Sequence, residues 1–317
     1  SNNHAVPYSF LGYVVGYLRC YYKLETVTAA LNIYQEDDDK SLEIIQYAKR
    51  NKIAIQPIKF GKSGADYTLD RDTNSIYKGI ESIKFCNRQI ADELLELSKN
   101  KYNSFIDLLK DINEHTSVNS RQLDILIKLN FFSDFGNNKY LLEVVDIYNK
   151  FANAKIIAKK KMEELGVSEF LMKKYAGRET KSQWRDLDNQ GLIKELCSKL
   201  ENKPLDIVSQ VKADMEYLGY SDYINENMSE DYYIVTVYDD KYDSCRPNVV
   251  LRRICDGEEI KSRIKQSKIF KENPFGEFSI LRIEGFTYVY KKKKVDNKWV
   301  STDETEPILE NYECMKG

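Results

Sequence analysis

The segment Gly61-Lys62-Ser63 has the residue types that close a phosphate-binding loop. In such a loop, backbone N–H groups curl around a phosphate, and this requires a further glycine five residues before the Gly-Lys pair. Gln56 stands at that position. We therefore predict a polar turn over these residues, with a nucleotide-binding loop as the less favoured alternative.

A second segment is spaced like a calcium-binding loop. Asp70, Asp72 and Asn74 would supply the first ligands, and Glu81 follows Asp70 by eleven residues. The sharp turn at the sixth position of such a loop normally requires glycine, but Ser75 is there. Helices on either side are not evident either. A hairpin turn is the favoured prediction, and calcium binding is the alternative.

No other group of residues has the spacing of a catalytic or metal centre. The acidic runs at 37–39 and 239–240 could bind Mg²⁺ in principle, but helix capping and loop solvation explain them better. His4 and His115 are too distant in sequence to suggest a pair, and no cysteines form a C-x-x-C pair. We predict no catalytic residue, metal or cofactor in this chain, and reduced thiols.

The composition limits the class of protein. The 317 residues include 48 Lys and Arg and 50 Asp and Glu, for a formal net charge of −2. This excludes a uniformly basic, histone-like protein but leaves room for local basic surfaces. The length predicts two or three domains. No apolar run reaches the ~18–20 residues of a membrane span, so we predict a cytoplasmic protein without a membrane partner.

Positive charge gathers in two segments. Residues 154–185 have nine Lys and Arg against four Glu, and residues 291–294 are four consecutive lysines. Segregated positive charge with aromatic residues between is typical of surfaces that bind a phosphate backbone. The alternative for each cluster is a solvated face without a ligand.

Apolar residues at spacings of three and four predict helices through the first two-thirds of the chain. Tyr8, Leu11, Val15, Leu18 and Tyr22 are spaced in this way, so we expect a helical region over residues 8–33 with one buried face.

Further helices are predicted along the next segments. Residues 37–39 open a second helix, residues 53–58 read as a short strand, and residues 82–151 read as short helices with short connections. We expect helix to continue over residues 154–219, with a more polar surface.

The pattern changes near Asp231, where alternation and β-branched or aromatic residues begin. The strands we predict span residues 232–238, 248–255, 277–284, 286–291 and 299–302. The fold class is therefore α+β and multidomain, mainly α-helical over the first two-thirds and followed by a small β-rich domain.

The N-terminal residues His4, Tyr8, Tyr13, Arg19 and Tyr22 resemble, in type and spacing, the fingers segment of C-family DNA polymerases, the bacterial DNA polymerase III alpha subunits. The family usually has serine where this chain has Asn3, and proline where it has Lys23. The resemblance implies that His4 and Arg19 face a nucleotide triphosphate.

Later segments add to this resemblance. Residues 79–84 and 123–136 resemble the tandem helix-hairpin-helix module of the family, and residues 212–223 resemble the helix that leads into its OB-fold domain. The first hairpin of the family usually has Gly-x-Gly, where this chain has Phe85 and Asn87. Asparagine tolerates a left-handed backbone, whereas phenylalanine is strained there. Asn130 replaces a glycine in the second hairpin.

The resemblance implies four parts: a fingers-like segment over 1–77, a tandem helix-hairpin-helix module over 78–153, a basic helical connector over 154–228 and an OB-like domain over 229–317. Together with the basic clusters, it implies DNA contacts from Lys84, Asn87, Arg88, Asn130, Lys159, Lys160, Lys161, Arg178, Lys181, Arg185, Lys291, Lys292, Lys293 and Lys294.

The function that this resemblance implies is that of a DNA-binding, C-terminal portion of a replicative polymerase. The catalytic carboxylates and their Mg²⁺ would belong to a palm that is absent here, so the chain alone is expected to be inactive. Expected partners are duplex and single-stranded DNA, a deoxynucleoside triphosphate in the full-length enzyme, and a sliding clamp or another replisome protein. The alternatives are a stand-alone DNA-binding protein and a scaffold that binds protein.

Overall fold

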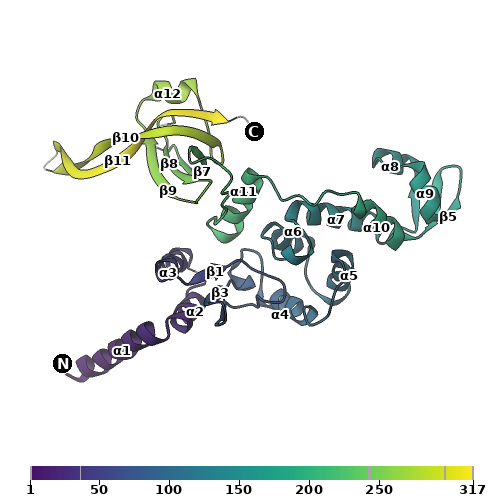
Figure 1. The fold of residues 1–317 in the computed structure, drawn as a ribbon, viewed down its shortest axis with the longest axis horizontal. Coiled ribbons are helices and arrows are strands. Elements are labelled where there is room, and N and C mark those ends of the chain that lie inside the picture. The colour runs from purple at the N-terminus through teal and green to yellow at the C-terminus, as the bar shows by residue number, and fades with distance from the viewer. Residues whose placement is uncertain (1, 36, 242–243, 296–297, 316–317) are drawn as a thin grey trace. The chain divides into compact units, whose positions relative to one another are not determined.

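A computed structural model describes residues 2–35, 37–241, 244–295 and 298–315. The chain divides between Leu205 and Asp206 into two compact units, which we call unit 1 and unit 2. Helices predominate in unit 1 and strands in unit 2 (Figure 1), so the predicted α+β class is confirmed. The finer division into four parts stays a prediction.

Unit 1 begins with three helices, α1 (Asn2–Tyr21), α2 (Lys23–Ile33) and α3 (Asp38–Arg50). Helix α2 buries one face, and Asp37 caps α3 by accepting a hydrogen bond from Lys40 N. Helix α1 extends away from the rest of unit 1 (Figure 1).

The predicted buried face over residues 8–33 is wrong for α1. Tyr8 is 72% exposed and Tyr13 is 71% exposed. The spacing is helical as expected, but no element in the described part of the chain covers these side chains. Leu24, Val27 and Leu31 of α2 are buried instead.

A small sheet follows, with the strand order β1-β3-β2. Its strands are β1 (Ala54–Gln56), β2 (Thr68–Asp70) and β3 (Ser75–Tyr77). The predicted hairpin turn is confirmed between β2 and β3, where Asp70 Oδ1 accepts hydrogen bonds from the N–H groups of Asp72 and Thr73. The polar turn predicted at residues 61–63 is also confirmed, with Gly61 in the left-handed region at φ 77°.

The helices predicted over residues 82–151 are confirmed. Each of the four α-helices presents a buried apolar stripe, because the spacing of its apolar residues matches the helical repeat. Side chains of Asn87, Ser104 and Asn119 cap three of them. The elements are η1 (Ile80–Ser82), α4 (Arg88–Leu97), α5 (Phe105–His115), α6 (Ser120–Lys128), η2 (Ser133–Phe135) and α7 (Asn138–Phe151).

The helix predicted across residues 154–219 is correct only in part, because a three-stranded sheet lies among the helices of this range. Its strand order is β4-β6-β5, and the buried Trp184 of β6 anchors its inner face. The elements are β4 (Ile156–Ala158), α8 (Lys159–Glu164), α9 (Glu169–Tyr175), β5 (Ala176–Glu179), β6 (Gln183–Leu187) and α10 (Asn189–Ser198).

In its described residues, unit 2 is a closed five-stranded barrel with two helices. The strand order is β7-β8-β9-β11-β10, and β10 returns to β7. Strands β9 and β11 pair in parallel, and the other pairs are antiparallel. The elements are α11 (Ile207–Leu218), β7 (Tyr232–Asp239), β8 (Asn248–Arg253), β9 (Glu259–Ile264), α12 (Ser267–Glu272), β10 (Ile280–Val295) and β11 (Lys298–Met315).

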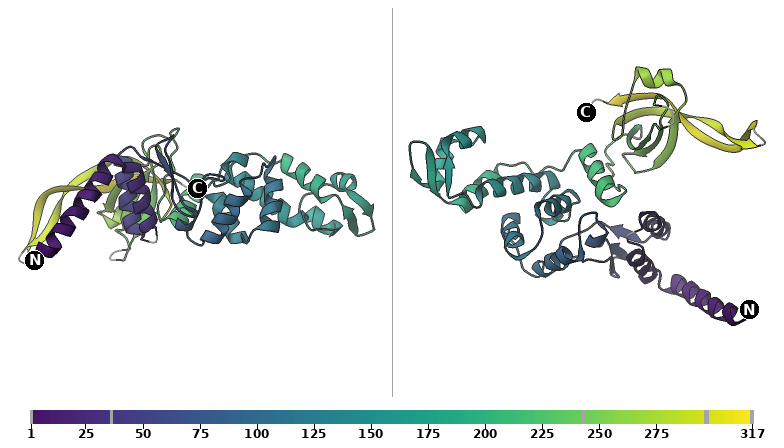
Figure 2. Two further views of the ribbon diagram at one scale, coloured as in Figure 1. Left: turned by 90° about the horizontal axis from the view of Figure 1, so that it is seen from below. Right: turned by 180° about the vertical axis from the view of Figure 1, so that it is seen from behind.

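Each strand contributes one fully buried side chain to the barrel core: Val235, Leu251, Ile264, Leu281 and Leu309. Strands β10 and β11 continue past the barrel as a two-stranded hairpin (Figure 2).

Two strand predictions in unit 2 need correction. Strand β9 was not predicted, because only Ser262 and Ile264 of its six residues are buried and no apolar alternation shows. The two strands predicted at 277–284 and 286–291 are one strand, in which Gly285 marks a shift of register and not an end.

None of the helices in the described ranges combines the length and the apolar character needed to cross a bilayer. All six cysteines are free thiols.

Candidate nucleic-acid interface

The first hairpin lies between η1 and α4, at residues 83–87. Cys86 N donates to Ile83 O at 3.1 Å, and Asn87 Oδ1 accepts from Ile90 N at 3.1 Å and so caps α4. Phe85 has φ 71°, in the left-handed region. A residue with a Cβ loses about 1–2 kcal/mol there, so the predicted strain at Phe85 is confirmed. Asn87 has φ −141° and is extended, not left-handed.

Helix α6 holds this strained turn in place. Gln122 Nε2 donates to the carbonyl oxygen of Phe85 at 3.1 Å, and the Arg121 guanidinium lies 3.5 Å from the centre of the Phe85 ring. The ring is still 52% exposed. A bulky, exposed side chain therefore stands at the tip of the first hairpin.

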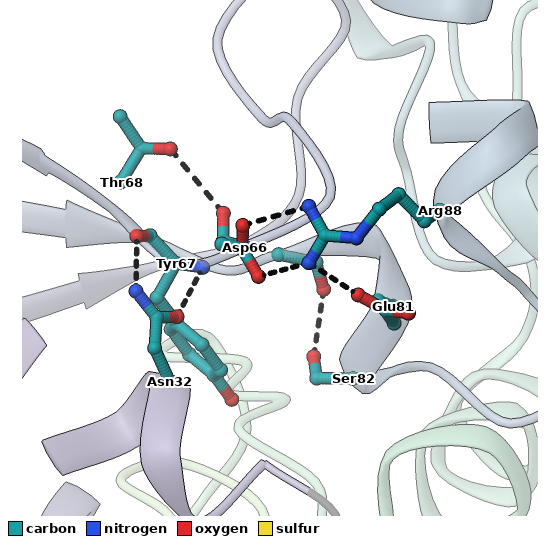
Figure 3. Close-up of polar contacts among 8 residues, drawn as sticks. Asn32, Asp66, Tyr67, Thr68, Glu81, Ser82 and Arg88 are labelled. Atoms are coloured by element: carbon teal, nitrogen blue, oxygen red, sulfur yellow. Dashed lines mark hydrogen bonds and ion pairs between the residues drawn. The ribbon is translucent and has the colours of Figure 1, made fainter. Parts of the chain in front are cut away.

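Backbone hydrogen bonds hold the first hairpin against the segment that precedes β2. Ile80 N donates to Gly64 O at 2.9 Å, and Glu81 N donates to Ala65 O at 3.0 Å. Arg88 donates to both carboxylate oxygens of Asp66, at 2.9 and 2.6 Å, and to Glu81 at 2.7 Å (Figure 3). The hydrogen bonds from Arg88 hold the pKa of the Asp66 carboxyl below its usual range.

Arg88 is thus engaged by two carboxylates, whereas Lys84 is exposed at the turn. Burial raises the pKa of the neighbouring Cys86 thiol to about 12, so this cysteine stays protonated. Of the cations predicted at this hairpin, Lys84 is the better placed to meet a phosphate.

We expect Arg88→Ala to lower the stability of unit 1 and to leave the salt dependence of DNA binding nearly unchanged, because the Arg88 charge is already neutralised. The lowered pKa of Asp66 stabilises the fold above the ordinary carboxyl pKa of ~3.9. This contribution disappears as the pH falls through the folded-state pKa of Asp66. The melting temperatures of wild type and variant should therefore converge as the pH is lowered from 7 to 3. Equal melting temperatures of wild type and variant at pH 7 would contradict a stabilising role for the ion pairs of Arg88.

The second hairpin joins α6 to α7. Asn130 has φ 62° at its tip, as a position that replaces glycine should, and Phe131 N donates to Leu126 O at 3.0 Å. Beneath the turn lie five aromatic rings whose neighbouring centroids are 4.8–6.2 Å apart, those of Phe60, Phe105, Phe131, Phe132 and Phe135. This cluster fixes the hairpin against the segment that follows β1.

The start of α7 is covered by residues 202–205, which the sequence did not indicate. Asn137 N donates to Asn202 Oδ1 at 2.8 Å, and Tyr140 N donates to Lys203 O at 3.2 Å. Leu205 N donates to the buried Asn138 Oδ1 at 2.8 Å. The N–H groups of Asn137 and Tyr140 are therefore already hydrogen-bonded within the protein and are not available to an anion.

The basic residues of 154–185 are distributed over both faces of the small sheet. Lys159 pairs with Glu179 and lies 4.7 Å from the centre of the Trp184 ring, while Lys160 and Lys161 are exposed on α8. The exposed Lys181 lies in the turn between β5 and β6. Arg178 and Arg185 are register partners across these two strands.

The remaining predicted residues lie at the two ends of the chain. Arg19 lies 4.9 Å from the centre of the Tyr47 ring, and the side chain of His4 is outside the described residues. In the β10–β11 hairpin, Lys291 forms an ion pair with Glu304 at 2.9 Å. The side chains of Lys292, Lys293 and Lys294 are also outside the described residues.

One group of potential metal ligands occurs on the last turn of α5. Single ligand atoms of Asp111, Glu114 and His115 lie within 4.8 Å of one another. Two of the three side chains are exposed, and such groups are common on helix surfaces without a metal.

Residues 52–142, which contain both hairpins, match the family model described as a helix-hairpin-helix motif. The chain is 30% identical over 144 residues to the DNA polymerase III subunit alpha of Thermus aquaticus, and 30% identical over 150 residues to that of Ureaplasma parvum serovar 3. It is 26% identical over 149 residues to that of Bacillus subtilis strain 168. Part of this chain is similar in sequence to the alpha subunit of DNA polymerase III.

The match covers 45–46% of this chain and only 12–15% of each of these relatives. The resemblance predicted from the hairpin segments is thus confirmed, and it concerns a small part of the alpha subunit. The family model ends at residue 142, before the β4-β6-β5 sheet and the barrel.

Proposed function

We propose that this chain is a DNA-binding part of a DNA polymerase III alpha-type polymerase, which holds primer-template DNA and does not polymerise by itself. The observation that carries this proposal is the tandem hairpin in the family-matched region, with a left-handed residue at each tip, Phe85 and Asn130. Exposed Lys84 supplies charge beside the first tip.

The topology of unit 2 supports a second region of DNA binding. We propose an OB-like fold for unit 2, supported by its five-stranded closed barrel, its parallel β9–β11 pair and the helix between its third and fourth strands. OB folds bind single strands through basic grooves and stacking aromatic side chains. Exposed Tyr288 and Tyr290 on the β10–β11 hairpin supply such side chains. We propose that unit 2 contacts the template single strand.

The longer polymerase would add the partners that this chain does not engage alone. We propose that α1 approaches the incoming nucleotide through Arg19 and His4, and that the catalytic carboxylates and their Mg²⁺ belong to a palm outside these residues. A sliding clamp or another replisome protein is the proposed protein partner, and the cytoplasm the proposed location.

The test is fluorescence anisotropy of a labelled primer-template, titrated with the whole chain at several salt concentrations. Each phosphate that the chain neutralises should contribute a slope of roughly −0.9 to the logarithm of affinity against that of salt. An affinity that does not depend on salt, or no binding at low salt, would refute the proposal. The exposed apolar side chains of α1 would then favour the protein-binding scaffold.

Phe85 provides a prediction specific to the first hairpin. We expect Phe85→Gly to bind DNA roughly threefold more tightly or better, because glycine relieves the left-handed strain and lets the backbone approach a phosphate. Phe85→Ala keeps the strain but removes the ring, so it should be about 1 kcal/mol less stable than Phe85→Gly. Anisotropy and urea unfolding measure the two effects. Weaker binding by the glycine variant would show that the ring itself contacts DNA.

A further inference from the structure

The outer face of the β4-β6-β5 sheet places two arginines directly opposite each other. Arg178 of β5 is the register partner of Arg185 of β6, and Ile156 of β4 is the partner of Arg185 on its other side. Register partners lie on the same face of a sheet, with Cβ atoms ~4.5–5.5 Å apart. This face therefore presents a row formed by Arg178, Arg185 and the 51% exposed Ile156.

No carboxylate neutralises this pair within residues 154–198, all of which the structure describes. The polar contact of Arg185 is a hydrogen bond from Nη2 to Gln183 Oε1 at 3.0 Å, and its buried Nε has no acceptor. The neighbouring Glu179 alternates to the opposite face, where it pairs with Lys159. Asp186, which follows Arg185, has φ 55° and is therefore not extended, and within residues 154–198 no ion pair joins it to either arginine.

The opposite face of the sheet explains why the fold tolerates this arrangement. Trp184 is buried there against Ile157 and Glu179, its two register partners. The pleat that buries Trp184 places the half-buried Arg185 on the other face, since successive side chains point to opposite faces. Like charges directly opposite each other destabilise a ladder. An arginine at position 178 therefore weakens the sheet unless an anion lies between the two guanidinium groups.

We propose that this outer face is a phosphate-binding surface for a nucleic-acid backbone, with Arg178 and Arg185 at its centre and Lys181 at its edge. Two guanidinium forks match the oxygens of a phosphodiester, which accepts paired hydrogen bonds. This proposal rests on the proposed DNA binding and adds a binding surface beyond the family-matched region, which ends at residue 142.

The test is Arg178→Glu in the whole chain, because its two expected effects have opposite signs. The new carboxylate would pair with Arg185, so the melting temperature should rise. The affinity for a labelled DNA duplex should fall severalfold, and the salt slope should fall by about 1, because one phosphate is no longer neutralised. Arg178→Gln should lower the slope similarly without adding a carboxylate.

Lys194→Glu is the matched control, because it makes the same charge change at an exposed position of α10. We expect its salt slope to stay within ~0.5 of the wild-type value. Suppose that wild type binds DNA and Phe85→Gly alters that binding. A salt slope for Arg178→Glu equal to that of Lys194→Glu would then overturn the proposal for the sheet and leave the proposed function standing. Absence of salt-dependent DNA binding by wild type would overturn both proposals. Displacement of DNA by poly-glutamate at equal charge concentration would point to an acidic protein partner and overturn the nucleic-acid assignment.

Discussion

Replacing Gly79 with alanine is expected to destabilise unit 1 by about 3 kcal/mol or more, at the severe end of overpacking. A Cβ at this position would lie 2.3 Å from Ala65 O, 2.5 Å from Asp66 C and 2.8 Å from Tyr67 N. All three are backbone atoms, so no side-chain rotation can relieve the clash. Backbone φ at Gly79 is −80°, which means that the cost is purely one of space.

The same substitution should also weaken DNA binding, by at least ~10-fold if the hairpin grips phosphate. The clash falls on the segment whose carbonyl groups accept hydrogen bonds from Ile80 N and Glu81 N. These bonds hold the first hairpin in place. Urea unfolding followed by circular dichroism, together with anisotropy, measures both effects. Gly64→Ala is the matched control, because its Cβ would meet only Leu95 Cδ2 at 3.8 Å. Equal stabilities for the two variants would contradict the packing described.

Phe132→Ala is the second substitution with a large expected effect. Phe132 is 0% exposed, and its ring centroid lies 4.8 Å from that of Phe131 and 5.3 Å from that of Phe105. Truncating a buried phenylalanine costs about 3–5 kcal/mol, because its apolar packing is removed and a cavity is left. The second hairpin rests on this cluster, so its geometry should be disrupted when the ring is removed.

Phe135→Ala removes a ring of the same size from the edge of that cluster, where the side chain is only half-buried. This variant should lower the free energy of unfolding by less than half as much as Phe132→Ala, because Phe135 buries less apolar area on folding than Phe132 does. Denaturant midpoints from circular dichroism would compare the two directly. A greater destabilisation by Phe135→Ala would show that the cluster is not centred on Phe132.

The helices that carry the hairpins could be predicted from the sequence. In α4 to α7, buried side chains such as Leu94, Leu108 and Leu126 recur at the helical repeat, and a polar residue caps three of the starts. The left-handed positions Phe85 and Asn130 could also be found, because they replace glycines of a resembling family. In both cases the signal is local in sequence.

Features that depend on contacts between distant segments could not be predicted. The sheet at 156–187 has strands of three to five residues with charged side chains among them, so no apolar alternation is visible. The opposition of Arg178 and Arg185 follows from strand register, which the sequence alone does not fix. Helix α1 has the pattern of a buried helix, and only the fold shows that nothing in the described chain covers it.

The exposure of α1 has a thermodynamic consequence. A 20-residue helix with Pro7, Gly12 and Gly16 has little intrinsic stability, because most helical stability in proteins comes from tertiary packing. Its local free energy of opening should therefore lie far below that of α4 to α7, and its amide hydrogens should exchange with solvent much sooner. Any surface that covers its aromatic side chains would slow that exchange, so hydrogen exchange along α1 would report its burial residue by residue.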